Sequence, residues 1–257
     1  MITGCFVNYS SLKELGSKTA KNGFKNEDDI VKKFNDWEND EDAQLWLIIM
    51  GYKLSEIEYV KALKVFQQKT DVQVQVTIKL KEAIDVQNLQ VKLVSNIRGF
   101  NQIDKRWIEK YAELWNMPET IVELLKQYTG ESKPNIRSPK DPRRMNANEF
   151  SEQDKDKLIR WLKDHKQLII SDILKGRGQF AAEWMLVAQK IKKNSRWVLK
   201  PMNYCLNFYS QGEVLITRRG TFKIGRITMQ RKGGDAGRKT AKMLQFKINP
   251  AELFEDY

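Results

Sequence analysis

The residues with the clearest potential for chemistry are Asp71, Gln90 and Lys92. Asp71 opens a segment that alternates polar and apolar residues like a half-buried strand, and Gln90 and Lys92 lie in a second such segment. Side chains alternate along a strand, so Gln90 and Lys92 share one face. An acid on one strand and an acid-x-Lys triplet on the next is the sequence form of a hydrolytic site, in which oxygen ligands hold Mg²⁺ and the lysine orients or activates water.

A second set of residues fits the same pattern. Asp235 precedes Gln245 and Lys247, and the segment LQFKI that contains the latter pair resembles the segment LQVKL around Gln90. Similar triplets arise by chance in a chain with 30% charged residues, and the polar face of an ordinary hairpin would also produce them. The pattern favours the first set and leaves the second open.

Glu27 is a further candidate acid. It lies on the apolar stripe of an amphipathic pattern, four residues before Val31. A carboxylate on such a stripe is costly unless it is hydrogen-bonded, paired or bound to metal. The alternative is that Glu27 lies at the edge of the stripe and reaches solvent.

Composition excludes several other chemistries. His165 is the only histidine, so two-histidine sites, including HNH nucleases and common zinc hydrolases, are excluded. Cys5 and Cys205 are the only cysteines, too few for a disulfide framework or a four-cysteine zinc site. The glycine-rich segments near Gly16 and Gly237 depart from P-loop spacing, which excludes a nucleotide site of that kind but still allows contacts to DNA phosphates.

Positive charge is concentrated near the C-terminus. Residues 212–247 contain ten Lys or Arg against two acids, a net charge of +8 out of +12 for the chain. This distribution indicates a polyanionic partner such as nucleic acid. The alternative is a solvated basic surface that only aids solubility.

Residue periodicity predicts the elements that would position these side chains. Apolar residues at helical spacing predict helices over 22–37, 42–50, 104–128, 151–165 and 180–193. Alternation predicts strands over 71–80 and 88–94 that could pair as a hairpin, and the segments VLITRRG, FKIGRITMQRKGGDAGR and MLQFKI predict short strands in the tail. The chain is therefore predicted to have both helices and strands.

The predicted boundary between two lobes is a segment with three prolines and few apolar residues. We expect residues 1–130 to carry the N-terminal helices and the candidate catalytic strands, and resemblance to a known family implies a recognition turn in the same part. Residues 131–148 would form a linker or long loop. Residues 149–257 would form a basic DNA-binding lobe packed on the same sheet or next to it.

Four long segments resemble the HinP1I-like type II restriction endonucleases, a GCGC-reading, MspI-like family of the PD-(D/E)XK nuclease superfamily. These segments are LGSKTAKNGFKNE, LQVKLVSNIRGFNQIDKRW, DILKGRGQFAAEW and QRKGGDAGRKTAKMLQFKI. The resemblance covers nearly the whole chain after about residue 15. It implies an α/β fold with a mixed central β-sheet flanked by helices, a restriction-endonuclease-like core, and a basic C-terminal lobe that contacts DNA.

The resemblance also assigns the site residues. It implies that Asp71, Gln90 and Lys92 are catalytic and that one or two Mg²⁺ ions are bound. Gln90 departs from the usual Asp or Glu of the superfamily and offers only a neutral carbonyl oxygen. Because one negative charge is lost, we expect Glu27 to join Asp71 and Gln90 as a metal ligand.

DNA contacts are implied in two groups. In the family, a phenylalanine wedges into the DNA stack and neighbouring polar residues reach bases, which would be Phe100, Asn101, Gln102 and Lys105 here. Phosphate contacts are expected from the basic residues Lys18, Arg231, Lys232, Arg238, Lys239 and Lys242.

The resemblance implies a type II restriction endonuclease that cleaves duplex DNA, at GCGC, by Mg²⁺-dependent phosphodiester hydrolysis. The alternatives are a non-cleaving sequence-specific DNA-binding protein and a structure-selective repair nuclease of the same superfamily. We expect a cognate DNA methyltransferase as functional partner, and a monomer or weak dimer. No stretch approaches the roughly 20 apolar residues of a membrane span, and no signal peptide is evident, so we expect a cytoplasmic protein without a membrane partner.

Overall fold

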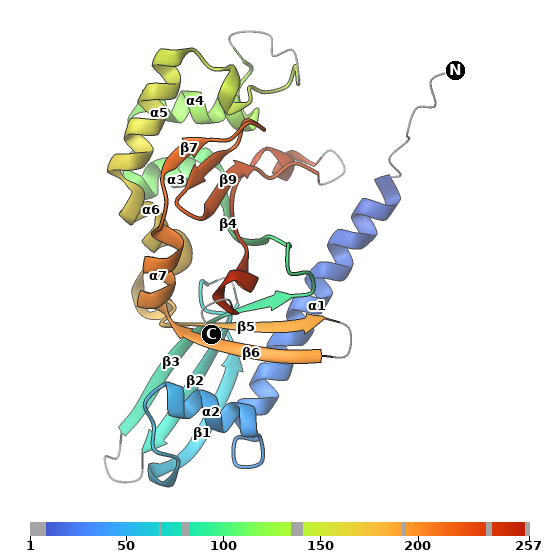
Figure 1. The fold of residues 1–257 in the computed structure, drawn as a ribbon, viewed down its shortest axis with the longest axis vertical. Coiled ribbons are helices and arrows are strands. Elements are labelled where there is room, and N and C mark those ends of the chain that lie inside the picture. The colour runs from blue at the N-terminus through green and yellow to red at the C-terminus, as the bar shows by residue number, and fades with distance from the viewer. Residues whose placement is uncertain are drawn as a thin grey trace.

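Two five-stranded sheets organise the part of the chain that the structure describes (Figure 1). The structure is a computed structural model, and it describes residues 9–66, 68–78, 83–134, 141–191, 194–234 and 238–254. For residues 9–20, 77, 78 and 83 it describes the backbone alone. The first sheet lies in the lower part of Figure 1, and the second sheet and helices α3 to α6 lie above it.

The first sheet is mixed, with strand order β1-β2-β3-β5-β6. Its strands are β1 (Ile57–Lys64), β2 (Val72–Ile78), β3 (Ala83–Val94), β5 (Trp184–Ile191) and β6 (Asn194–Pro201). β3 and β5 run parallel, and the other neighbours are antiparallel. The predicted hairpin of β2 and β3 is confirmed, with Val72 opposite Leu89.

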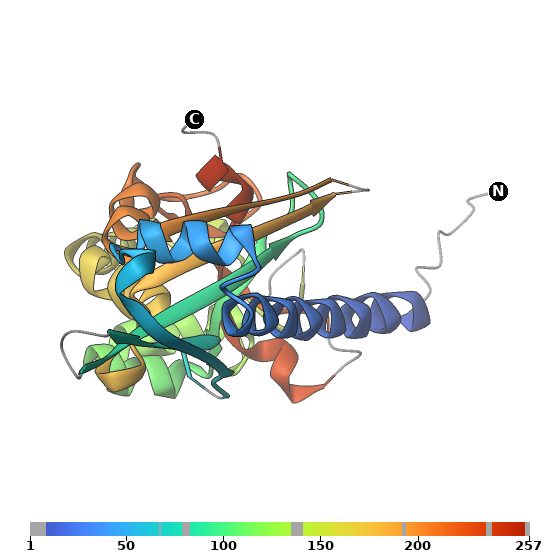
Figure 2. The ribbon, with the colours of Figure 1, turned by 90° about the horizontal axis from the view of Figure 1, so that it is seen from below.

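Two N-terminal helices cover one face of the first sheet. They are α1 (Tyr9–Asn35) and α2 (Glu41–Ile49), which lie on the same side of the strands in Figure 2. Ile30 and Phe34 of α1 pack with Trp46 of α2 against alternate residues of β2. The predicted amphipathic helix is therefore confirmed, because burial of this apolar stripe holds α1 on the sheet.

The second sheet is antiparallel, with strand order β4-β10-β9-β8-β7. Its strands are β4 (Asn101–Arg106), β7 (Val214–Ile216), β8 (Phe222–Ile224), β9 (Ile227–Arg231) and β10 (Leu244–Ile248). The strands predicted in the tail are thus confirmed. The remaining α-helices of the described residues are α3 (Ile108–Trp115), α4 (Glu119–Thr129), α5 (Glu152–Asp164), α6 (Lys166–Leu174) and α7 (Met202–Ser210).

The predicted helix over residues 180–193 is wrong. Strand β5 occupies most of this range and lies between β3 and β6, with residues 185–189 all buried. A central strand with both faces covered has a continuous apolar sequence instead of an alternating one, so its periodicity resembles that of a buried helix.

The predicted helix over residues 104–128 is also wrong in part. Residues 104–106 belong to β4, which pairs with β10. The first helix then begins at Ile108 and ends at Trp115, and its C-cap residue Asn116 has a left-handed backbone (φ 47°). Pro118 follows and caps α4, so local backbone geometry divides one predicted helix into two.

The two sheets are interleaved along the sequence. β4 belongs to the second sheet although it precedes residue 131, whereas β5 and β6 belong to the first sheet although they follow residue 148. The fold class is nevertheless the predicted one, a mixed central sheet flanked by helices. No helix of the described residues is long and apolar enough to cross a membrane.

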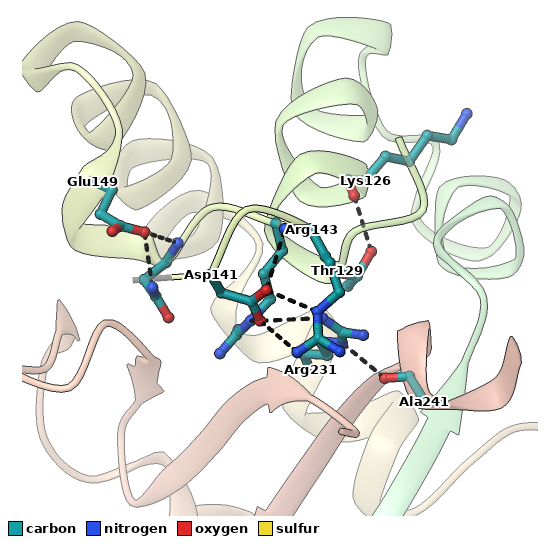
Figure 3. A network of polar contacts seen from close by, with 9 residues as sticks. Lys126, Thr129, Asp141, Arg143, Glu149, Arg231 and Ala241 are labelled. Atoms are coloured by element: carbon teal, nitrogen blue, oxygen red, sulfur yellow. Dashed lines mark hydrogen bonds and ion pairs between the residues drawn. The ribbon is translucent and has the colours of Figure 1, made fainter. Parts of the chain in front are cut away.

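The described end of the predicted linker is attached to the second sheet. Asp141 accepts hydrogen bonds from Arg143 at 2.9 Å and from Arg144 at 3.3 Å. It also lies 3.8 Å from Arg231 of β9, which donates to the carbonyl of Ala241 (Figure 3). Residues 135–140, in the middle of the predicted linker, lie outside the described residues.

Candidate active site and DNA-contacting residues

Asp71 and Lys92 meet where strand β2 begins. The Asp71 amide donates to the carbonyl of Leu89 at 2.8 Å, which ties the residue before β2 to β3. Its Oδ2 atom accepts from the Val91 amide at 2.6 Å and from Lys92 Nζ at 3.3 Å. Lys92 Nζ also donates to the Val91 carbonyl at 2.9 Å. The hairpin register therefore orients both side chains.

Gln90 is buried on β3, two residues before Lys92. Its side chain points to the same face of β3 as Lys92, because side chains alternate along a strand. Gln90 is 2% exposed, and its Oε1 atom has no hydrogen-bond partner among the described residues. A buried carbonyl oxygen without a partner is costly, and it is also the hard oxygen ligand that Mg²⁺ and Ca²⁺ prefer. The position of Gln90 therefore fits a metal ligand.

Glu27 of α1 reaches the same region. Burial raises the pKa of its carboxyl above the usual value, the Asp71 carboxylate raises it further, and Lys64 and Lys92 oppose the rise. Lys64 Nζ of β1 lies 3.7 Å from Glu27 Oε2. Two carboxylates that repel each other are groups whose mutual repulsion a bound divalent cation would offset.

The candidate metal site contains few acidic side chains. Among the described residues, no group of three or more His, Cys, Asp or Glu side chains lies close enough to hold a metal. The candidate ligands are two carboxylates, Asp71 and Glu27, and the amide of Gln90, which stands where the superfamily usually has an acid. Lys64 was missed by sequence reasoning, because strand β1 was not predicted and its lysine had no pattern to mark it.

The rival triplet lies in the other sheet. Gln245 and Lys247 belong to β10, and Gln245 Nε2 donates to the carbonyl of Lys232 at 3.3 Å. Burial, together with Lys232, lowers the pKa of Lys247. Asp235, the acid of this triplet, lies outside the described residues. Gln245 therefore has a structural partner, whereas Gln90 Oε1 has none within the part of the chain that is described.

The predicted reading residues follow strand β3 and continue into β4. Phe100 is 47% exposed, and Lys223 Nζ lies 5.5 Å from the centre of its ring. Asn101 donates to the carbonyl of Leu93 at 2.9 Å, which holds the start of β4 against the end of β3. Most of the predicted recognition turn is therefore strand.

Gln102 and Lys105 lie on β4 and line a cleft of about 630 Å³. The same cleft is lined by Lys69, which is two residues before Asp71, and by Arg177 beyond α6. The structure thus brings the two predicted base-reading residues to a cleft that extends to the chain segment leading into the candidate active site.

The predicted phosphate-binding residues differ in their surroundings. Arg238, Lys239 and Lys242 are exposed near β10, where an anionic backbone could reach them. The Arg231 side chain is 11% exposed and is engaged with Asp141 and Ala241, so it already has partners inside the protein. Lys232 is half-buried, and the Lys18 side chain lies outside the described residues.

Two comparisons relate the chain to known proteins. Residues 50–254 match the family model described as R.HinP1I restriction endonuclease. The fold is similar to that of the crystal structure of restriction endonuclease MspI in complex with its cognate DNA, with a TM-score of 0.65, 16% sequence identity, and 91% of this chain and 92% of that chain covered. No curated protein matches the sequence.

Proposed function

Because the chain belongs to the R.HinP1I restriction endonuclease family and is a type II site-specific deoxyribonuclease, we propose that it cleaves duplex DNA at GCGC with bound Mg²⁺. The observation that carries the proposed site is the contact of Asp71 with Lys92, two residues after Gln90, whose buried Oε1 atom has no hydrogen-bond partner among the described residues. The family is one whose enzymes generally use divalent metal ions. The choice of Mg²⁺ and of GCGC rests on the sequence resemblance.

Asp71, Gln90 and Glu27 would hold the divalent cation. When bound, the cation stabilises the negative charge that develops on the scissile phosphate. Lys92 Nζ donates to Asp71 and to the Val91 carbonyl, and its third N–H can donate to water or to a phosphate oxygen. Lys92 therefore orients the attacking water and keeps positive charge beside the phosphate.

Residues of strand β4 would read the DNA sequence. Gln102 and Lys105 can donate to guanine O6 and N7 in the major groove. Phe100 is exposed at the start of this segment and would pry open a base step. Arg238, Lys239 and Lys242 would contact phosphates, which position the protein and carry no sequence information.

The test is digestion of a plasmid that contains GCGC sites, with and without Mg²⁺, followed by mapping of the ends. We expect cuts at GCGC alone, and only with the cation. Binding to GCGC without cuts would favour the non-cleaving DNA-binding protein. Cuts governed by branches or mismatches would favour the structure-selective nuclease.

One functional partner and an oligomeric state follow from the proposed function. A DNA methyltransferase of matching specificity would protect host GCGC sites, so fully methylated plasmid should resist cleavage. We propose a monomer or weak dimer, which sedimentation of the protein with and without a GCGC duplex would test.

Replacing Gln90 by Glu is expected to change the metal preference and to retain metal dependence. The added carboxylate raises the negative charge of the site and binds hard cations more tightly. Cleavage is measured while Mg²⁺, Mn²⁺ and Ca²⁺ are titrated against wild type and Gln90→Glu. Gln245→Glu, in the second sheet, is the matched control. Unchanged affinity and preference in Gln90→Glu would remove Gln90 from the coordination shell.

A further inference from the structure

Lys69 joins the segment that leads into the active site to strand β4 of the second sheet. Its Nζ atom donates to the carbonyl of Ile103 at 2.9 Å and to the carbonyl of Ile173, near the end of α6, at 2.6 Å. It also forms an ion pair with Asp104 at 2.5 Å. The Lys69 side chain is 13% exposed and that of Asp104 is 6% exposed. Asp71 follows only two residues later along the chain.

The β4 end of this link lies between the two predicted base-reading residues. Ile103 and Asp104 separate Gln102 from Lys105. The Asp104 carboxylate also accepts from Tyr111 Oη at 2.5 Å and from Arg106 at 3.1 and 3.3 Å. A buried carboxylate with this many donors has one preferred position, so the link is rigid where β4 would read DNA.

The active-site end of the link is held equally firmly. Thr70 Oγ1 donates to the carbonyl of Phe180 at 2.8 Å, and the Asp71 amide donates to Leu89 of β3 at 2.8 Å. Three consecutive residues, 69 to 71, are thus bonded to β4, to the loop before β5 and to β3. Because only Thr70 separates Lys69 from Asp71, the position of Lys69 constrains the backbone from which the Asp71 side chain extends.

Gly176 makes room for the Lys69 side chain. A Cβ atom at position 176 would lie 2.5 Å from Lys69 Cγ, and the Gly176 backbone is left-handed (φ +77°). Any other residue here would displace the lysine stem and would strain the backbone. The chain between α6 and β5 is therefore shaped to admit Lys69.

We propose that Lys69 is a positioning residue that couples base reading on β4 to the position of Asp71, and so contributes to cleavage specificity. This inference rests on the proposed function of Asp71, Gln102 and Lys105. Correct bases hold β4 in one position through its reading residues, and the Lys69–Asp104 pair transmits that position to the metal ligand. A wrong base leaves β4 displaced, and a displacement of about 1 Å at a reacting centre costs about a hundredfold in rate.

The test compares wild type with Lys69→Met on a GCGC duplex and on duplexes with one base pair changed. Single-turnover cleavage rates are measured with Mg²⁺, and binding of each duplex is measured in EDTA. For Lys69→Met we expect a cognate rate about tenfold to a hundredfold lower, a smaller ratio between cognate and changed sites, and little change in cognate affinity.

Asp104→Asn tests the same link from the β4 side. It keeps the size of the side chain and removes the charge that Lys69 pairs with. If the link acts as a unit, the double variant should lose no more than the worse single variant. Lys33→Met is the matched control, because Lys33 bridges Asp40 and Asp42 in a comparable part-buried pair that does not touch β4. It should retain both the rate and the ratio.

The inference is overturned if Lys69→Met keeps the wild-type rate and ratio, or if its rates on all duplexes fall by the same factor. Thermal unfolding of each variant is followed, and rates are compared well below the lowest midpoint. If Lys69→Met does not fold, Asp104→Asn decides by the same two criteria. A wild type that does not prefer GCGC would instead refute the proposed function, so the two failures are distinguishable.

Discussion

Replacing Asp71 by Asn is expected to lower the cleavage rate roughly a thousandfold, because several kcal/mol of charge stabilisation depend on the bound cation and each ~1.4 kcal/mol is a factor of ten. Folding should survive, since an asparagine oxygen can still accept from the Val91 amide that Asp71 Oδ2 contacts at 2.6 Å. Single-turnover cleavage of a GCGC duplex measures the rate, and a binding titration in EDTA measures the affinity.

The same experiment includes Lys92→Met, which keeps the length of the stem and removes the charged donor. We expect a loss of about 10²–10⁴-fold in rate, the usual contribution of a positioned proton donor or acceptor. DNA affinity should change little for either variant, because both groups act on the metal and the water. The contact of Asp71 with Lys92 at 3.3 Å makes them one unit, so the double variant should lose less than the product of the single losses.

The controls for the active site lie in the second sheet. Gln245→Ala and Lys247→Met alter the rival triplet on β10, and Asp235→Ala alters its acid. These variants should cleave GCGC with the wild-type metal dependence. If Lys247→Met or Asp235→Ala abolishes cleavage while DNA binding persists, and Lys92→Met is harmless, the active site has been placed on the wrong sheet.

Substituting Gln102 or Lys105 by Ala is expected to cost about 1–3 kcal/mol of affinity for the cognate duplex and little for random DNA. Each residue lies on β4 and lines the cleft near the active site, where a base-edge contact would be lost. Discrimination between the two DNAs should therefore shrink.

Lys239→Ala and Lys242→Ala should behave differently. Both lysines are exposed beside β10, and loss of a phosphate contact weakens cognate and random DNA alike. The slope of log affinity against log salt should fall by about 1 for each contact removed. Competition titrations at several salt concentrations separate the two classes.

Equal losses for both DNAs in Gln102→Ala and Lys105→Ala would mean that β4 only clamps the backbone. Specificity would then have to come from the basic C-terminal segment. Arg231 is the less suitable residue there, because its guanidinium already contacts Asp141 and the Ala241 carbonyl. Arg238 is exposed and would be the first substitution to make.

The secondary structure could be predicted from the sequence in the elements whose apolar residues repeat with a single helical or strand period. Helix α1, the β2–β3 hairpin and the strands of the tail each have one buried face, so their apolar residues repeat with the period of a helix or a strand. The predicted strand over 88–94 also determined that Gln90 and Lys92 share a face, since side chains alternate along a strand. Residue patterns alone left the set of Asp235, Gln245 and Lys247 open, and the choice of Asp71, Gln90 and Lys92 rests on the family resemblance.

Tertiary structure decided the features that depend on contacts between distant segments. Strand β5 is buried on both faces between β3 and β6, so its sequence has no alternation to distinguish it from a helix. The Asp71 carboxylate raises the pKa of Glu27 because α1 packs across the sheet. Lys69 meets Asp104 because two sheets that interleave along the chain come together. Such contacts depend on how whole elements pack, which local residue patterns do not record.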